Sequence, residues 1–272
     1  MKKMMITGLV CVFIGVVLCG AAYAMNTNTG NADLSSDNIS FLADGVSKIN
    51  IGAGVAHIRI LKGDVNSTDI TIKAENIIVE NFNCDLEDNT LKISYNPNSH
   101  KFGFVSLPKI GFINKEAQID IYIPDGQIFD EFIFDCGVGK IETEQINAQS
   151  IIIKDGVGEY DIKNLIAGNL DITGGVGEIK INGVINGNTK IDCGVGSVKL
   201  SGQANGDIKI KGGVGEIKLD LTGNVDDYNI KAEHGIGSIH LNGGKIPKST
   251  QANGKYKIDI DAGVGSIDVN IK

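Results

Sequence analysis

The chain is poor in the residues that build several common kinds of binding site. Its 272 residues include no tryptophan and a single arginine, Arg59, and its net charge is −8. Without tryptophan the chain lacks the best aromatic platform for stacking against a sugar ring. With one arginine and no basic stripe it has little to neutralise a row of phosphates. We therefore expect neither a typical sugar-cleaving site nor a nucleic-acid partner.

The five cysteines do not predict a disulfide framework. Cys11 and Cys19 lie in an apolar N-terminal run, and Cys84 has no evident partner. Cys136 and Cys193 occupy the same position of a repeat three units apart, or roughly 14 Å if the units stack at about 4.8 Å. That separation is too long for a disulfide, so both are predicted to be small buried hydrophobes. The four histidines do not cluster either, and no metal or cofactor is predicted.

What the chain does have is a repeat. A Gly-Val-Gly tripeptide recurs every nineteen residues, two looser copies follow it, and an earlier relative precedes it. A fixed period of this length is typical of a stacked repeat architecture. It also disfavours an enzyme, because repeated sequence offers repeated surface. The copies begin at Gly137, Gly156, Gly175, Gly194 and Gly213, the looser ones are Gly235-Ile236-Gly237 and Gly263-Val264-Gly265, and the relative is Gly54-Val55-Ala56.

One copy shows how the repeat folds. Around Gly194, apolar or small residues alternate with polar ones as far as Val195, and the buried positions then shift by one residue to Val198 and Leu200. Such a shift turns every later side chain to the other face unless the backbone turns as well. Gly196 is therefore expected at a corner with positive φ, and the tripeptide valine is expected to fill that corner.

These features predict an all-β fold. Two short strands and two turns per nineteen residues suit one coil of a β-solenoid, a single-stranded β-helix whose coils stack about 4.8 Å apart. A meander of antiparallel hairpins is the alternative. An apolar N-terminal helix is expected to precede the coils. In either architecture, the last strand, residues 266–272, is expected at an exposed edge where another chain could pair with it.

The N-terminus carries a targeting or anchoring signal. Lys2 and Lys3 precede an uncharged run from Met4 to Met25, which is long enough to span a bilayer. Ala22-Tyr23-Ala24 also resembles a cleavage site, and Cys19 invites a lipoprotein interpretation. Each alternative places the rest of the chain outside the cytoplasm, either anchored to the cell membrane or secreted. We predict a signal peptide or anchor at 1–25, a flexible tether at 26–47, N-terminal β coils with a capping loop at 48–130, and the repeat solenoid at 131–272.

Residues 100–112 form an apolar stretch without a clean period. Phe102, Phe104 and Phe112 lie in it. As a functional element it would be an apolar patch for a partner or a lipid surface. As a structural element it would close the open end of the solenoid, since terminal coils need a cap. If it binds a partner, the protein would be a membrane-tethered regulatory module.

The repeat resembles a known family. The carrying motifs are Ile121-Tyr122-Ile123-Pro124 and the copies at residues 136–139, 174–178 and 212–216. Together they resemble the bacterial putative adhesin family with β-strand repeats, a domain of unknown function, over about residues 45–272. The resemblance implies a single-stranded β-helix in the cell envelope, and the family name implies adhesion. It supplies no catalytic residues.

The charged residues suggest the remaining candidate sites. Glu159, Glu178 and Glu216 share one outward position, with lysines on the neighbouring row. In stacked coils Glu159 and Glu178 would lie roughly 5 Å apart, the separation of a retaining glycosidase pair, so a polysaccharide-cleaving enzyme is the catalytic alternative. The favoured hypothesis is non-catalytic: a multivalent surface that binds a cell-wall polymer, matrix or surface protein. Asp155 and His234 fall in the inward row, where corner backbone amides are their expected partners.

Overall fold

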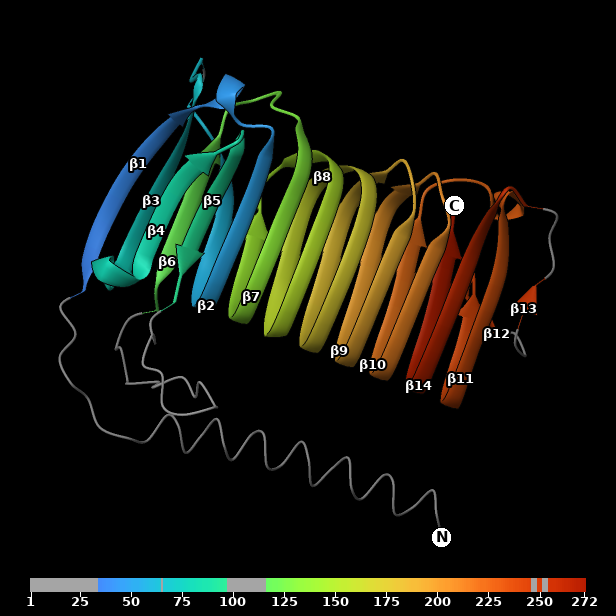
Figure 1. Ribbon diagram of the computed structural model, residues 1–272. Helices are drawn as coiled ribbons and strands as arrows, with labels where there is room; N and C mark the ends of the chain where they lie inside the picture. The colour runs from blue at the N-terminus through green and yellow to red at the C-terminus, as the bar shows by residue number, and fades with distance from the viewer. Residues whose placement is uncertain (1–33, 65, 97–115, 246–248, 251–253) are drawn as a thin grey trace, which may run out of the picture.

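The computed structural model describes residues 34–64, 66–96, 116–245, 249–250 and 254–272. These residues are almost entirely strand and form one open sheet that coils along its length (Figure 1). Three single-turn 3-10 helices interrupt the strands: η1 (Ala43–Gly45), η2 (Val79–Asn81) and η3 (Val225–Asp227). The strands are β1 (Ser35–Leu42), β2 (Lys48–Lys62), β3 (Asp69–Ile77), β4 (Phe82–Glu87), β5 (Thr90–Tyr95), β6 (Gln118–Ile123), β7 (Phe129–Thr143), β8 (Ile146–Ile185), β9 (Thr189–Ala204), β10 (Ile208–Leu221), β11 (Tyr228–Leu241), β12 (Gly244–Lys245), β13 (Ser249–Thr250) and β14 (Tyr256–Ile271).

Successive repeats stack in parallel and in register. Residues paired across neighbouring coils are nineteen apart, as in Phe132 with Ile151 and Ile191 with Ile210. Each coil has one strand before the Gly-Val-Gly corner and one after it, with the apolar core between them. The parallel pairing excludes a meander of antiparallel hairpins in this region, and the architecture is consistent with the predicted β-solenoid.

The corners form one long edge of the stack, called here the corner edge. Gly196 has a φ of 144°, and Val198 and Leu200 beyond it are buried, so the predicted corner and the shift of the buried face are confirmed. The prediction that the tripeptide valines fill the corner is wrong. Val138, Val157, Val176, Val214 and Val264 are 41–45% exposed. The backbone turns so tightly between the two glycines that the middle side chain points to solvent.

The opposite edge, called here the turn edge, is held together by polar side chains. Asn169 Oδ1 accepts a hydrogen bond from the backbone N of Asn188 at 2.9 Å. In the next coil Asn188 Oδ1 accepts from the backbone N of Asp207 at 3.2 Å. Asp207 Oδ1 in turn accepts from the backbone N of Lys257 at 2.9 Å. Because each side chain satisfies a backbone donor of the next coil, the turns repeat in register with the strands.

Two strands are out of sequence order. β2 lies between β7 on one side and β5 with β6 on the other. At the far end β14 lies between β10 and β11. The prediction of an exposed final strand over residues 266–272 is therefore wrong, because Ser266–Val269 are paired on both sides. The outermost complete coil is β11, and the short strands β12 and β13 pair with its outer edge.

The charged side chains of β14 are complementary to those of its two neighbours, β10 and β11. The acidic Asp259 of β14 lies between Lys209 of β10 and Lys231 of β11. Farther along β14, Asp268 lies opposite Lys218 of β10 and contacts His240 Nδ1 of β11 at 2.9 Å. Opposite charges in directly paired positions stabilise a sheet and like charges destabilise it. Placing β14 here separates basic residues that would otherwise lie side by side.

β2 shows the converse pattern, with basic residues between acidic neighbours. His57 Nε2 lies 2.8 Å from Glu142 Oε2 of β7. Arg59 forms a two-pronged pair with Asp120 of β6, in which its Nε donates to Oδ1 at 2.7 Å and its terminal nitrogen donates to Oδ2. Asp120 is only 5% exposed. The hydrogen bond to Asp120 raises the pKa of Arg59.

We predict that Arg59→Met lowers the free energy of unfolding by about 2–3 kcal/mol, because it leaves a buried carboxylate without its partner. This loss is smaller than that for a fully buried pair, because the arginine side chain is itself one third exposed. Urea unfolding of the full chain measures the change. The control is Lys92→Met, which breaks the exposed pair with Glu87 and should cost much less, because water screens both charges. Equal losses of unfolding free energy in both variants would show that the Arg59–Asp120 pair stabilises the fold no more than an exposed ion pair does.

The N-terminal region departs from the sequence prediction in one respect. Within residues 26–47, predicted to be a flexible tether, Ser35–Leu42 form β1, which pairs antiparallel with β3. The inward side chains of β3, Ile70 and Ile72 among them, are buried. The predicted apolar helix and segment 1–25 lie outside the described residues. Among the residues that are described, no helix is long and apolar enough to cross a membrane.

Candidate binding surface

The strand that follows each corner displays two parallel rows of outward side chains. The register aligns Lys140 with Glu159, and Glu178 with Ser197 and then Glu216. The neighbouring row aligns Lys180, Lys199 and Lys218, called here the lysine ladder. The predicted site residues Glu159, Glu178 and Glu216 therefore do share one row, beside the expected lysines. Both rows arise because outward positions alternate with the buried ones and the coils repeat in register.

Ion pairs join these rows within and between coils. Lys180 Nζ lies 2.8 Å from Glu178 Oε2, while Lys199 and Lys218 share Asp220 at 4.0 and 3.6 Å. Three lysines thus have two close carboxylates between them. The side chains of the ladder are 39–50% exposed, so these pairs are screened by water and weak. An external anion can compete for such lysines.

The N-terminal end of the same face is a tighter network. Lys140 Nζ lies 2.9 Å from Glu142 and 3.7 Å from Glu159, and His57 contacts the same Glu142. Lys140, and to a lesser degree His57, lower the pKa of Glu142. Glu159 and Glu178 are one coil apart, but each carboxylate pairs with a lysine and is 46% or 42% exposed. This open, salt-bridged setting differs from the enclosed site that glycoside cleavage uses.

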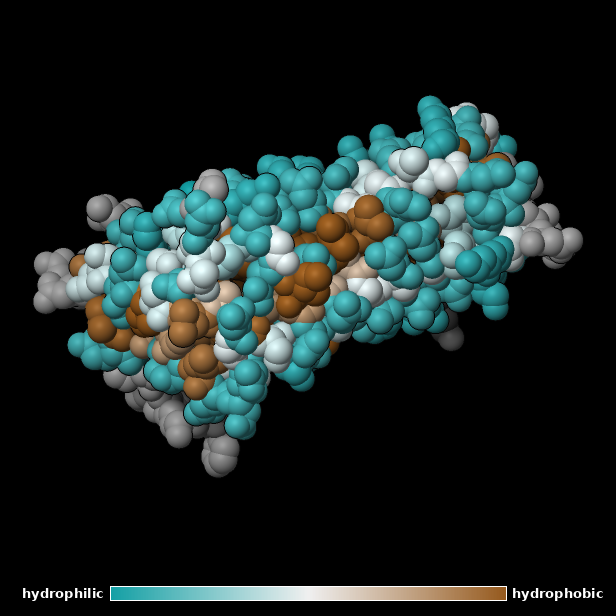
Figure 2. All heavy atoms as spheres, turned by 90° about the horizontal axis from the view of Figure 1, so that it is seen from above, coloured by the Kyte–Doolittle hydropathy of each residue, from teal (hydrophilic) through white to brown (hydrophobic). Residues whose placement is uncertain are grey.

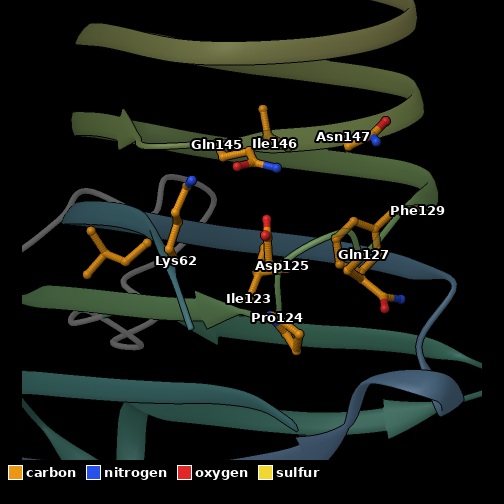
Figure 3. Close-up of a pocket in the computed structure, with 10 residues that line it drawn as sticks. Lys62, Ile123, Pro124, Asp125, Gln127, Phe129, Gln145, Ile146 and Asn147 are labelled. Atoms are coloured by element: carbon orange, nitrogen blue, oxygen red, sulfur yellow. The ribbon is translucent and has the colours of Figure 1, made fainter. Parts of the chain in front are cut away.

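Two small hollows mark the described surface. A hollow of about 20 Å³ lies at the turn edge, where Asp125 and Gln127 meet Gln145 and Asn147, with Lys62 nearby (Figure 3). That volume has room for one water molecule, whereas small-molecule sites run to several hundred Å³. The described residues also contain no cluster of three or more side chains suited to a metal ion.

A smaller hollow of about 10 Å³ lies inside the corner edge beside Asp155, Tyr160 and Cys193. Asp155 Oδ1 accepts a hydrogen bond from the backbone N of Gly156 at 2.7 Å, as predicted for this inward position. Burial raises the pKa of Asp155. The Tyr160 hydroxyl lies beside this carboxyl without a hydrogen bond of normal geometry. His234 differs from the prediction, because its Nδ1 is buried without a partner among the described residues.

The described cysteines are free thiols. Cys136 is buried, as predicted, and Cys193 is half-buried. Burial raises the pKa of Cys84 and of Cys136 to about 12. Since the thiolate is the reactive form, we expect both thiols to react more slowly than a free cysteine at neutral pH.

One part of the predicted site lies outside the described residues, and one exposed feature was not predicted. Phe102, Phe104 and Phe112, with the whole 100–112 loop, lie outside the described residues. The row of exposed valines at the corner edge was missed, because the alternation up to each corner places the valine among the inward residues. The two glycines that flank each valine could have indicated this row, because glycine is typical of positions where two backbones pass too closely to admit a side chain.

Taken together, an open stack of coils with repeated charged rows defines a repeat protein that offers extended surface. The chain belongs to the Toastrack DUF4097 family, whose model matches residues 46–269. It is a domain of unknown function among bacterial putative adhesins, and the resemblance seen in the sequence is thereby confirmed.

Several solved structures are similar to the chain. A putative cell adhesion protein from Clostridium sporogenes is 20% identical, with a TM-score of 0.44, over 88% of this chain and 100% of that one. A putative adhesin from Bacteroides fragilis is 17% identical, with a TM-score of 0.40, over 86% of this chain and 97% of that one. A putative lipid binding protein from Parabacteroides distasonis is 17% identical, with a TM-score of 0.37, over 89% and 98%. No curated protein matches the chain.

Proposed function

We propose that this protein is a non-catalytic binding module of the cell envelope, held at the outer side of the cell membrane by its N-terminal segment. The observation that carries the proposal is the lysine ladder, a straight row of partly neutralised cations repeated at the spacing of the coils. The names of the similar adhesins agree with a binding role.

The ligand that suits such a row is an extended polymer with regularly spaced anionic groups, such as an anionic cell-wall polymer. Each exposed lysine contributes little alone. Several contacts along one chain add up, because after the first contact the later ones are intramolecular. A matrix polymer or a surface protein with an acidic strip would satisfy the same chemistry. The overall negative charge of the protein would repel polyanions elsewhere, which restricts binding to the ladder.

The test is retention of full-length protein, in detergent micelles, on immobilised poly(glycerol phosphate). The lysine-to-glutamine triple variant at 180, 199 and 218 should bind about tenfold more weakly, because it removes three weak but additive contacts. The matched control neutralises Lys154, Lys190 and Lys209 on the strands before the corners, where the charge change is the same. The control should bind within about twofold of the unmodified protein.

Two results would count against this proposal. Equal weakening in both triple variants would show that net charge alone decides retention. Unchanged binding in the ladder variant would place the contact elsewhere on the molecule.

A further inference from the structure

The corner edge carries a line of aliphatic side chains, one per coil, of which six are exposed and two, Val55 and Val195, are half-buried. In the order of stacking this valine ridge consists of Val55, Val138, Val157, Val176, Val195, Val214, Val264 and Ile236. Ile236 at the far end is 72% exposed. Eight coils at about 4.8 Å give a ridge of about 34 Å. Contiguous apolar surface of this kind on a soluble domain marks an interaction site.

The flanks of the ridge are bare backbone. A Cβ atom on Gly194 or Gly213 would meet the carbonyl oxygen of the preceding coil, and the second glycine of each Gly-Val-Gly copy is crowded as well. The valines therefore stand alone at the apex of the edge, with nothing beside them to cover their methyl groups. A flat apolar surface can touch every coil at once, whereas a globular partner would need a matching groove.

The first described strand, which follows the apolar N-terminal run, begins at this same edge. Ser35, the first residue of β1, pairs with Ile77 at the end of β3, and this end of β3 lies beside the start of β6. The start of β6 lies beside His57, directly after the first corner. The uncharged run Met4–Met25 is therefore joined to Ser35 at the corner edge through nine residues, 26–34, a connection that spans at most about 35 Å.

The second such segment begins and ends at the same corner. Tyr95 pairs with Ala53 just before the corner of β2, and Gln118 pairs with His57 just after it. Between these two paired positions the chain has twenty-two residues, 96–117, where β2 has three, 54–56. The sequence between them contains Phe102, Phe104 and Phe112 and no acidic residue before Glu116.

The turn edge offers no equivalent. Figure 2 looks onto it and shows hydrophobic side chains in patches, bordered by polar ones. Its exposed apolar residues include Ile128 and Ile166, but asparagine side chains occupy much of the edge between coils. The apolar ridge thus lies on the same edge as Ser35, Tyr95 and Gln118, the described residues from which the two apolar sequences continue.

We propose that the corner edge lies on a lipid surface, so that the stack of coils rests along the bilayer with its valine ridge in contact with the lipid. The inference rests on the anchoring part of the proposed function. The rows beyond the flanking glycines hold more acidic than basic side chains, with Glu159, Glu178, Glu216, Asp192 and Asp261 against Lys140, Lys154 and Lys211. This excess of negative charge disfavours anionic headgroups, so zwitterionic lipid is the expected surface. In this orientation the lysine ladder stays on the side of the stack, open to a polymer.

Because the chain has no tryptophan, a single introduced tryptophan reports its own environment. The full-length variants Val176→Trp and Val264→Trp are placed in phosphatidylcholine vesicles that contain brominated phosphatidylcholine. The control is Ile166→Trp at the turn edge, because Ile166 and Val176 are 43% and 45% exposed. Sedimentation of the vesicles separately shows whether the protein is anchored.

We expect brominated lipid to quench both ridge tryptophans by at least twofold and to leave the turn-edge tryptophan unaffected. Added phosphatidylglycerol should reduce the quenching. If the protein sediments with the vesicles but the ridge tryptophans are not quenched, the lipid contact is overturned while the anchor stands. A ridge tryptophan whose emission is blue-shifted but not quenched would show that protein covers the ridge, either residues 97–115 or a second copy, and this would also overturn the proposal. If the protein does not sediment with the vesicles, the anchoring proposal is wrong, and the lipid contact that rests on it is overturned with it.

Discussion

Gly215→Ala is expected to destabilise the protein by more than about 3 kcal/mol, a large effect for adding one methyl group. Gly215 has a φ of 149°, and its Cβ position would overlap the carbonyl oxygen of Gly196 in the neighbouring coil. In this conformation the Cα–Cβ bond points along the stack, so the coils would have to separate locally. Parallel pairing would be lost on that side of the corner.

The matched control for this substitution is Gly223→Ala. Gly223 has nearly the same φ, 153°, but a Cβ atom there has open space around it. It should therefore cost only the backbone strain, about 1–2 kcal/mol. Chemical denaturation of both variants gives the difference. Similar losses would mean that close stacking of the corners does not constrain the sequence, and that φ alone explains the glycines.

Ending the chain after residue 253 is expected to release more than one coil. β14 buries Ile258, Ile260, Ile267 and Val269, and it supplies the pairing partner for β10 on one side and β11 on the other. Removing an ordinary end coil would open one interface, whereas removing β14 opens two. Amide hydrogen exchange should become at least a hundredfold faster throughout β11 and along the freed edge of β10. β7 to β9 should keep their protection, because repeat stacks are held by nearest neighbours.

The contrary outcome for the truncated chain has a specific structural meaning. β11 also carries a Gly-Ile-Gly corner and buried inward residues, so it could move directly onto β10. That movement would place Lys231 beside Lys209 and His240 beside Lys218, which the sheet disfavours. If β11 keeps its slow exchange in the truncated chain, shape would outweigh charge in setting the order of strands. The charge-matching explanation for the position of β14 would then be wrong.

Several features of the fold follow from the short-range sequence pattern of a single repeat. The nineteen-residue period predicted the stacked coils because each coil repeats the same short-range pattern. The charged rows followed directly from that period, since outward positions align once the coils are in register. The glycine at position 196 was placed correctly because a change in the parity of the buried residues requires a backbone turn.

The exposed valines could not be placed in the same way. Alternation assigns Val195 and its equivalents to the inward set, but a glycine corner turns the middle residue away from the core. The direction of that side chain depends on how closely two neighbouring coils approach each other. The sequence of one repeat does not specify that distance.

The sequence by itself determined the repeat, the all-β class, the buried and outward positions of the strands apart from the corner valines, and the acidic and basic rows. Only the tertiary structure decided that β2 and β14 lie out of sequence order and that Ser35 begins at the corner edge. It also decided that the valines form one continuous ridge. The physical reason is that periodicity records which face of a strand is buried, whereas the choice of neighbour depends on charges and backbone edges contributed by distant segments. Asp259, for example, lies between Lys209 and Lys231, and nothing in the sequence near Asp259 identifies these two lysines as its neighbours.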